Sequence, residues 1–166
     1  MSGDGKIKPC WVLIVDDDPN VLEGFRRGLQ GFSLETAGNG RDALTLVNNR
    51  EYAVIVSDLS MPMMDGLTFL ERTREVSPYS TRVVVTGDAD LEKALDAVNR
   101  GNVFQFLQKP CSSDMLAQTI RAGVEQFNLV SDKMKLESEN RVLKARLTKA
   151  EELAGQLQRQ LQQQRS

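Results

Sequence analysis

Short apolar runs alternate with helix-like stretches along most of the chain, and this alternation limits the possible folds more than any other feature. Strand-like runs stand near residues 11–16, 34–37, 53–58, 82–86 and 104–107. Stretches of helical length lie between them, near 19–30, 40–50, 66–75 and 90–100. Strands that alternate with helices form βαβ units, so the chain is predicted to build a parallel sheet.

Chemically useful side chains stand where four of these runs end. An acidic triplet, residues 16–18, follows the first run, and Asp58 closes the third. Thr86 closes the fourth run, and Lys109 follows the fifth. Parallel strands all end on the same side of a sheet, and the ligand crevice lies outside that edge. We therefore expect these side chains to meet in one site.

The residue types in this expected site suit phosphoryl chemistry. Clustered carboxylates repel one another, so at neutral pH they take up a proton or recruit a cation. Mg²⁺ is the best match, because it binds through one or two carboxylates together with phosphate oxygens and water. The Asp58 carboxylate can attack phosphorus and hold the group as an acyl phosphate. Lys109 supplies a mobile ammonium, and Thr86 a hydroxyl donor.

Four segments resemble the receiver domain of bacterial two-component response regulators: VDDDP at 15–19, SDLSMPMMDG at 57–66, VVTGDA at 84–89 and FLQKP at 106–110. The resemblance is specific because these elements occur together and in the family's order. It implies an α/β fold, a flavodoxin-like doubly wound sheet of five parallel strands with five helices. The predicted organisation is a flexible N-terminus over 1–9, a receiver domain over 10–128 and a helical coiled-coil extension over 129–166.

The resemblance also implies a role for each acid of the site. Asp58 is the expected phosphoacceptor, and a sensor histidine kinase is the expected donor. Asp16 and Asp17 would hold Mg²⁺ together with Asp58 and the backbone carbonyl of Ser60. Asp18 is interpreted as a supporting acid or a helix cap. An enzyme acting on other substrates is not expected, because such a domain catalyses only its own phosphorylation and dephosphorylation.

The remaining implied roles belong to the switch that reads the phosphoryl group. Lys109 would pair with the phosphoryl oxygens, and the Thr86 hydroxyl would move toward them. Phe106 stands at the position of the switch aromatic and would swing inward, although an ordinary core role is equally compatible with the sequence. Cys111 follows the Lys-Pro pair where an aromatic residue is common. The Lys109–Pro110 bond is usually cis in this family.

Composition narrows the function further. The chain has 166 residues, 40% of them hydrophobic, which is enough for one domain of about 120 residues and an appendage. It has no histidine, which excludes a histidine kinase or a histidine-dependent hydrolase. A net charge of −2 argues against direct nucleic-acid binding. The sequence has no apolar run of membrane-spanning length, and nothing suggests that its two cysteines form a disulfide. A bacterial cytoplasmic location is therefore expected.

A fifth helix is predicted from Ser112, with Leu116, Ile120, Val124 and Phe127 on the face toward the sheet. It continues into a heptad repeat that has Asn140, Leu147 and Leu161 at a positions and Leu136, Leu143 and Leu157 at d positions. Leucine at d and a buried asparagine at a favour a parallel homodimer. Opposite charges at g and e′, such as Glu139 with Lys144, support the same register.

Several alternatives are compatible with the sequence. The C-terminal segment could be a single amphipathic or partly disordered tail, because its end is rich in glutamine. Asp16 and Asp18 have the spacing of a haloacid-dehalogenase-like phosphatase motif, but that interpretation leaves Asp58 without a role. A structural dimerisation module that is never phosphorylated is a third possibility. The output, which could involve cyclic-di-nucleotide signalling, is not determined by these residues.

Overall fold

The computed structural model describes residues 10–99 and 103–165. The predicted flexible N-terminus over 1–9 and the predicted ends of the fourth helix at 100 and of the coiled coil at 166 lie outside the described residues. The chain divides into two compact units, residues 1–128 and 129–166. The two units are described separately.

The first unit contains a five-stranded sheet with the order β2-β1-β3-β4-β5, and all neighbouring strands are parallel. The strands are β1 (Trp11–Val15), β2 (Ser33–Ala37), β3 (Val54–Asp58), β4 (Thr81–Thr86) and β5 (Gln105–Gln108). The helices are α1 (Pro19–Gly28), α2 (Gly40–Asn49), α3 (Gly66–Val76), α4 (Leu91–Asn99) and α5 (Ser113–Gln164), with a short 3-10 helix, η1 (Asp88–Asp90), before α4. The predicted doubly wound α/β fold is confirmed.

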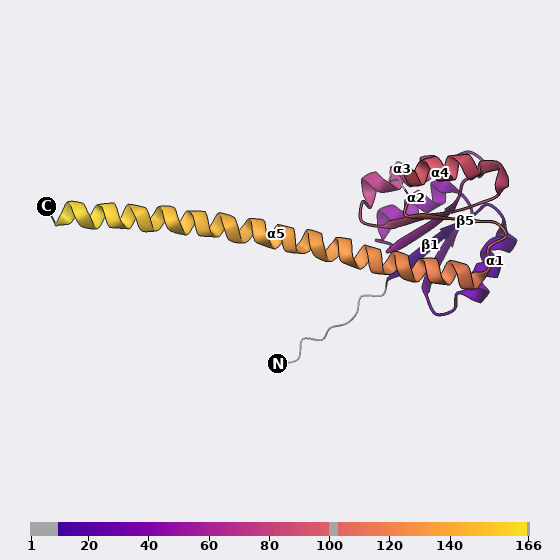
Figure 1. The fold of residues 1–166 in the computed structure, drawn as a ribbon, viewed down its shortest axis with the longest axis horizontal. Coiled ribbons are helices and arrows are strands. Elements are labelled where there is room, and N and C mark those ends of the chain that lie inside the picture. The colour runs from indigo at the N-terminus through magenta and orange to yellow at the C-terminus, as the bar shows by residue number, and fades with distance from the viewer. Residues whose placement is uncertain (1–9, 100–102, 166) are drawn as a thin grey trace. The chain divides into compact units, whose positions relative to one another are not determined.

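Helices cover both faces of this sheet (Figure 1). One core cluster joins α1 and the start of α5 to the sheet through Phe25, Leu29, Leu116 and Ile120. The other cluster joins α2, α3 and α4 to the opposite face. The three central strands are buried on both sides, which explains their continuous runs of Val, Ile and Leu.

The predicted sheet-facing side of the fifth helix is correct. Leu116 and Ile120 are fully buried, and Val124 and Phe127 pack partly buried against the same cluster. Gly123 allows the helix to approach the sheet closely, because a Cβ at this position would lie 2.9 Å from Val54 Cγ2. The Gly123 carbonyl also accepts a hydrogen bond of 2.8 Å from the Thr81 hydroxyl.

The predicted boundaries differ from the structure by one or two residues. The first helix ends at Gly28 rather than at residue 30, because Leu29 leaves the helical conformation and buries its side chain. The fourth helix begins at Leu91 rather than at residue 90, since Asp88–Asp90 form the separate 3-10 turn. The fifth helix begins at Ser113, and the Ser112 hydroxyl accepts a hydrogen bond from the Met115 backbone N–H at 3.2 Å. Such caps satisfy helix-end donors that lack an intrahelical partner.

The second unit is the continuation of α5, which is helical through Gln164. Its predicted d-position side chains Leu136, Leu143 and Leu157 are 59%, 59% and 50% exposed, and Leu147 and Leu161 at a positions are 60% and 56% exposed. A single chain therefore leaves this stripe of leucines unburied. Among the described residues, no helix is both long enough and apolar enough to cross a membrane.

Candidate functional site

Three carboxylates converge at the carboxyl edge of the sheet. Asp16 directly follows β1 and Asp58 ends β3, and these strands are neighbours in the sheet. Together with Asp17 they present ligand oxygens that all lie within 4.8 Å of one another. Asp16 and Asp58 are only 3% and 7% exposed, whereas Asp17 is open to solvent. The three acids thus lie close together, as predicted from the strands that they follow.

Lys109 brings a positive charge to the two buried acids. Its Nζ lies 2.8 Å from Asp16 Oδ2 and 3.4 Å from Asp58 Oδ2. Lys109 follows β5, two strands away from β3, and its backbone N–H donates a 2.7 Å hydrogen bond to the Thr86 carbonyl. The following bond to Pro110 is cis, as expected. The ammonium thus links two carboxylates that would otherwise repel each other at close range.

Burial and charge act in opposite directions on these groups. Burial raises the pKa of Asp58, the charge of Lys109 lowers it, and the nearby Asp16 raises it again, so the net pKa is above its usual value. Burial lowers the pKa of Lys109, but the hydrogen bond to Asp16 and the charges of both acids outweigh this effect and raise it. Asp58 is therefore a carboxylate whose negative charge is not fully compensated by the surrounding protein.

A divalent cation fits this set of donors. Three carboxylates with one lysine leave an excess of negative charge, and hard oxygen ligands are those that Mg²⁺ prefers. The backbone of Ser60 lies close enough to the Asp58 carboxylate to lower its pKa, which places Ser60 next to the acid cluster. Asp16, Asp17 and Asp58 are thus the residues that could hold the ion.

Asp18 does not join the cluster but caps α1. Its carboxylate accepts a 2.8 Å hydrogen bond from the Asn20 backbone N–H, and its own backbone N–H donates to Asp16 Oδ1 at 2.9 Å. Of the two roles considered for Asp18, the helix cap is the one that the structure contains. By holding Asp16 through its backbone, Asp18 also supports the site.

The two predicted switch residues lie on neighbouring strands, β4 and β5. Thr86 is fully buried at the end of β4, and its hydroxyl is 3.4 Å from the Gly87 carbonyl oxygen. Phe106 lies on β5 beside Val84 and packs, partly buried, against the core cluster that includes α2, α3 and α4. Thr86 therefore stands just before η1 and α4 in the chain, and Phe106 lies on the strand that follows them.

Two contacts on the loop after β4 were not anticipated from the sequence. The Ser60 hydroxyl donates to the Asp90 carboxylate, and the Gln108 side-chain amide donates to the Asp88 carboxylate. The acidic character of this loop, GDAD at 87–90, was visible in the sequence, but its partners were not. Loop contacts between residues far apart in sequence depend on the tertiary fold.

Gly66 is a second feature that the sequence marked only as a turn. A Cβ at this position would lie 1.9 Å from the backbone carbonyl oxygen of Asp58, and the Gly66 N–H donates to the Leu59 carbonyl at 2.9 Å. Only glycine allows α3 to begin so close to the end of β3. Gly66 therefore fixes the backbone that carries Asp58.

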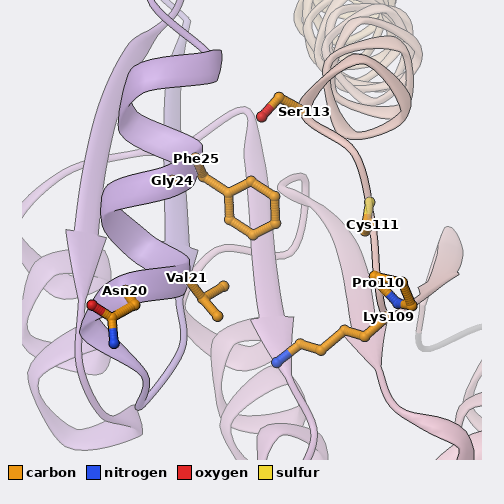
Figure 2. A pocket seen from close by; sticks show the side chains of 8 residues that line it. All are labelled: Asn20, Val21, Gly24, Phe25, Lys109, Pro110, Cys111 and Ser113. Carbon is orange, nitrogen blue, oxygen red and sulfur yellow. The ribbon is translucent and has the colours of Figure 1, made fainter.

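A pocket of about 580 Å³ opens beside the site, between α1 and the segment that joins β5 to α5 (Figure 2). Its lining residues are Asn20, Val21, Gly24 and Phe25 from α1 and Lys109, Pro110, Cys111 and Ser113 from the joining segment. Burial raises the pKa of the Cys111 thiol, which keeps the thiol protonated. Because the Lys109 side chain lines the pocket and also reaches the acids, the two features are adjacent.

Comparison with known proteins decides the family. The family model described as the response regulator receiver domain matches residues 12–121. The chain belongs to the response regulator receiver family. The matched span covers β2 to β5 and all of β1 except Trp11, together with the acid cluster described above, and it makes the protein a signalling module of two-component systems.

Individual relatives agree with this assignment. The transcriptional regulatory protein GlrR of Escherichia coli (strain K12) is 35% identical over 127 residues, which are 75% of this receiver chain and 28% of GlrR. A solved structure titled adenylate cyclase from Rhodopirellula baltica has a TM-score of 0.76 and 36% identity, covering 79% of this chain and 98% of that one. The signal receiver domain of an HD domain-containing protein from Pseudomonas fluorescens Pf-5 has a TM-score of 0.69 and 29% identity, covering 75% and 93%.

Proposed function

We propose that this receiver accepts a phosphoryl group on Asp58 from a sensor histidine kinase. The observation that carries the proposal is the convergence of three carboxylates within 4.8 Å, two of them bridged by Lys109. Receiver domains of two-component systems are phosphorylated by histidine kinases, so family membership supports the same donor. The haloacid-dehalogenase-like alternative is not favoured, because the response regulator receiver model matches residues 12–121, which contain all three acids.

The proposed reaction transfers phosphorus from nitrogen to oxygen. An Asp58 carboxylate oxygen attacks the phosphorus of the donor's phosphohistidine, the new O–P bond forms, and the N–P bond breaks with its electron pair returning to the imidazole. Bound Mg²⁺, held by Asp16, Asp17, Asp58 and the Ser60 backbone carbonyl, would offset the charge of the carboxylates and of the phosphoryl oxygens. Lys109 orients the group by ion pairing.

The response to phosphorylation is proposed to begin at Thr86. A phosphoryl group adds about two negative charges beside Lys109. The Thr86 hydroxyl, which is 3.4 Å from the Gly87 carbonyl, would turn to donate to a phosphoryl oxygen. Phe106 would then occupy the space that Thr86 leaves. Such a rearrangement selects one of two packings of the surface formed by α4 and β5.

The heptad of the second unit is proposed to form a parallel homodimer. The leucines at a and d are exposed to water in a single chain. A second helix that covers them would remove their apolar surface from water, which is favourable. A buried Asn140 pairs with its own copy when two chains are parallel and in register. Phosphorylation would act on this dimer, and a receiver that dimerises but is never phosphorylated is the remaining alternative.

The activity that this receiver controls is proposed from relatives that are longer than the chain. The chain spans about 28% of the length of curated relatives such as GlrR, which is described as a transcriptional regulatory protein. Two structural relatives carry other names, an adenylate cyclase and an HD domain-containing protein. We propose that this receiver controls an output domain or partner protein in the bacterial cytoplasm. We include in this proposal that the output involves cyclic-di-nucleotide signalling. We also propose that this chain does not itself bind nucleic acid.

Incubation with Mg²⁺ and acetyl phosphate tests the assignment of Asp58. Wild-type protein is expected to gain one phosphoryl group, measured by intact mass and mapped by peptide analysis after reductive trapping. Asp58→Asn is expected to gain none, and the surface control Asp132→Asn is expected to behave like wild type. Equal labelling of wild type and Asp58→Asn would refute the assignment, and no Mg²⁺-dependent labelling of any variant would favour the purely structural module.

A further inference from the structure

Ser57 is a buried polar residue at a position of the sheet that is otherwise apolar. The three residues before it in β3 are Val, Ile and Val, and its neighbours across the sheet are Val15 on β1 and Val84 on β4. Ser57 and both of these valines are buried. Burying a hydroxyl costs free energy unless it makes a hydrogen bond, so a serine at this position needs a partner.

That partner is the main chain of the proposed phosphoacceptor. The Ser57 hydroxyl donates a 2.8 Å hydrogen bond to the backbone carbonyl oxygen of Asp58. The same carbonyl stands against the start of α3, because a Cβ on Gly66 would lie 1.9 Å from its oxygen. The Asp58 carbonyl is therefore both hydrogen-bonded by Ser57 and confined by the first residue of α3.

Two consecutive peptide groups after β3 are held in this way. The Asp58 carbonyl belongs to the planar peptide group that joins Asp58 to Leu59, and the Leu59 carbonyl accepts a 2.9 Å hydrogen bond from the Gly66 backbone N–H. With both groups held, the direction of the next carbonyl, that of Ser60, is set by the backbone dihedral angles of Ser60 itself. Ser57 thus acts on the main chain that carries the Asp58 carboxylate and the Ser60 carbonyl.

We propose that Ser57 is a positioning residue for the Mg²⁺ site, because its hydroxyl preorganises the main chain of residues 58–60. This inference rests on the proposed function, in which the Asp58 carboxylate and the Ser60 carbonyl are ligands of the ion. Mg²⁺ demands nearly ideal octahedral geometry, so a main chain that already holds its oxygens in place avoids an ordering cost on binding. Ser57 acts through the Asp58 backbone and is not itself a ligand.

The Mg²⁺ affinity of the full chain, measured by isothermal titration calorimetry without any phosphodonor, tests this inference. Ser57→Ala removes the hydroxyl and adds no bulk to the buried position. It is expected to raise the Kd for Mg²⁺ by about threefold to tenfold, the effect of one ordinary hydrogen bond. An unchanged Kd would overturn the inference.

Ser80 offers a matched control for the loss of a buried serine. It is also buried, and its hydroxyl donates a 2.6 Å hydrogen bond to the backbone carbonyl of Tyr52. Ser80 directly precedes β4, so this bond lies at the end of the sheet opposite the acids. Ser80→Ala is expected to lower stability but to keep its Kd for Mg²⁺ within about twofold of wild type. An equal rise of the Kd in Ser57→Ala and Ser80→Ala would show a general loss of structure and would overturn the inference.

A second pair of variants separates the hydroxyl of residue 57 from the volume of its side chain. Ser57→Thr and Ser57→Val add the same bulk to the buried position, so both carry a similar packing cost, but only threonine retains a hydroxyl. Ser57→Thr is expected to bind Mg²⁺ about threefold to tenfold more tightly than Ser57→Val. Equal affinities of these two variants would contradict a role for the hydroxyl.

Phosphorylation by acetyl phosphate at varied Mg²⁺ provides a kinetic readout. In Ser57→Ala the Mg²⁺ concentration at half-maximal rate is expected to rise by the same factor as the Kd. The maximal rate is expected to change less, because the bound ion then holds residues 58–60 in place of the lost hydrogen bond. A lower maximal rate with an unchanged Mg²⁺ dependence would show that Ser57 acts on the reaction in another way, and would overturn the inference.

These measurements distinguish a failure of the inference from a failure of the proposed function. If wild type binds Mg²⁺ and gains label on Asp58 but the Ser57 variants show no change in Mg²⁺ dependence, only the inference is overturned. If wild type neither binds Mg²⁺ nor gains label on Asp58, the proposed function is rejected and the inference with it.

Discussion

At the scale of single residues, the buried acids of the site lower the stability of the fold. Asp58 is buried beside Asp16, and the Lys109 ammonium is shared between them. Burying a carboxylate is costly unless it is paired, and a pair of carboxylates sharing one cation is only partly compensated. The same incomplete compensation is the reason to expect that the site binds a divalent ion.

The pH dependence of stability follows from the raised pKa of Asp58. Burial is the largest of its causes and raises this pKa above the ordinary value of 3.8. The folded protein therefore holds the proton more tightly than the unfolded chain, and this contribution to stability is present below about pH 4 and lost as the pH rises through the raised pKa. At neutral pH the ionised Asp58 destabilises the fold.

Asp58→Asn is accordingly expected to raise the melting temperature at pH 7 in metal-free buffer. A gain of about 2–8 °C corresponds to roughly 1 kcal/mol in a protein of this size. The difference between variant and wild type is expected to shrink as the pH falls toward 4, and calorimetry over this range measures it. A variant less stable than wild type at pH 7 would contradict the assigned cause.

Gly66 provides a second prediction at this scale. Gly66→Ala would drive a Cβ into the Asp58 carbonyl oxygen, so we expect a loss of about 1–3 kcal/mol or more in unfolding free energy. The matched control is Gly24→Ala within α1, where an added Cβ meets nothing within 4 Å. Because alanine is the better helix former, the control is expected to gain up to about 1 kcal/mol. Urea denaturation compares the two, and equal effects would contradict this account of Gly66.

At the scale of elements, α5 carries two different apolar patterns in one helix. Over its first part, Leu116 and Ile120 face the sheet, and Gly123 lets the backbone approach Val54 and Thr81. Over the second unit the apolar residues follow a heptad instead, and a single chain leaves them exposed. The first pattern is satisfied within the chain, whereas the second would be satisfied by the proposed homodimer.

Two neighbouring residues test the heptad register. Leu143 and Val142 are similarly exposed in one chain, at 59% and 52%, but only Leu143 lies at a d position. Leu143→Lys is expected to weaken self-association by about 30-fold or more, because it places a charge in the buried seam. Val142→Lys, at a c position, is expected to leave the dimer intact. Sedimentation equilibrium measures both, and equal weakening would contradict the register.

At the scale of the whole molecule, the sheet edge gathers residues from β1, β3 and β5 into one charged site. Strand order places β1 and β3 side by side, and Lys109 reaches them from beyond β4. A cation that offsets the negative charge of this site is thus expected to affect the stability of the receiver fold. A ligand that binds only the folded state stabilises it by mass action.

Mg²⁺ is therefore expected to raise the unfolding free energy of the whole protein. The gain is about 2.7 kcal/mol when the ion is present at 100 times its Kd. Asp17→Asn is the informative variant, because Asp17 is exposed and its loss leaves the Lys109 bridge in place. It is expected to fold normally and to show a much smaller Mg²⁺ effect in thermal melts with matched ionic strength. An equal effect in both proteins would place the ion elsewhere.

Much of the fold and of the site could be predicted from the sequence because both depend on local patterns. Strand–helix alternation requires only the periodicity of apolar residues, and the acids follow strands whose ends meet in any parallel sheet. The predicted end of α1 and the predicted start of α4 differ from Gly28 and Leu91 by two residues and one residue, since caps and the short 3-10 turn depend on detailed backbone geometry.

The sequence by itself determined which residues are chemically able to form the site and on which strands they stand. The tertiary structure alone decided how they pair: Lys109 with Asp16, 93 residues apart, and Ser60 with Asp90, 30 residues apart. It also decided that the room beside the Asp58 carbonyl admits only glycine at residue 66. Periodicity is a property of neighbouring residues, whereas a hydrogen bond between distant loops exists only when the register of the whole sheet brings its two atoms together.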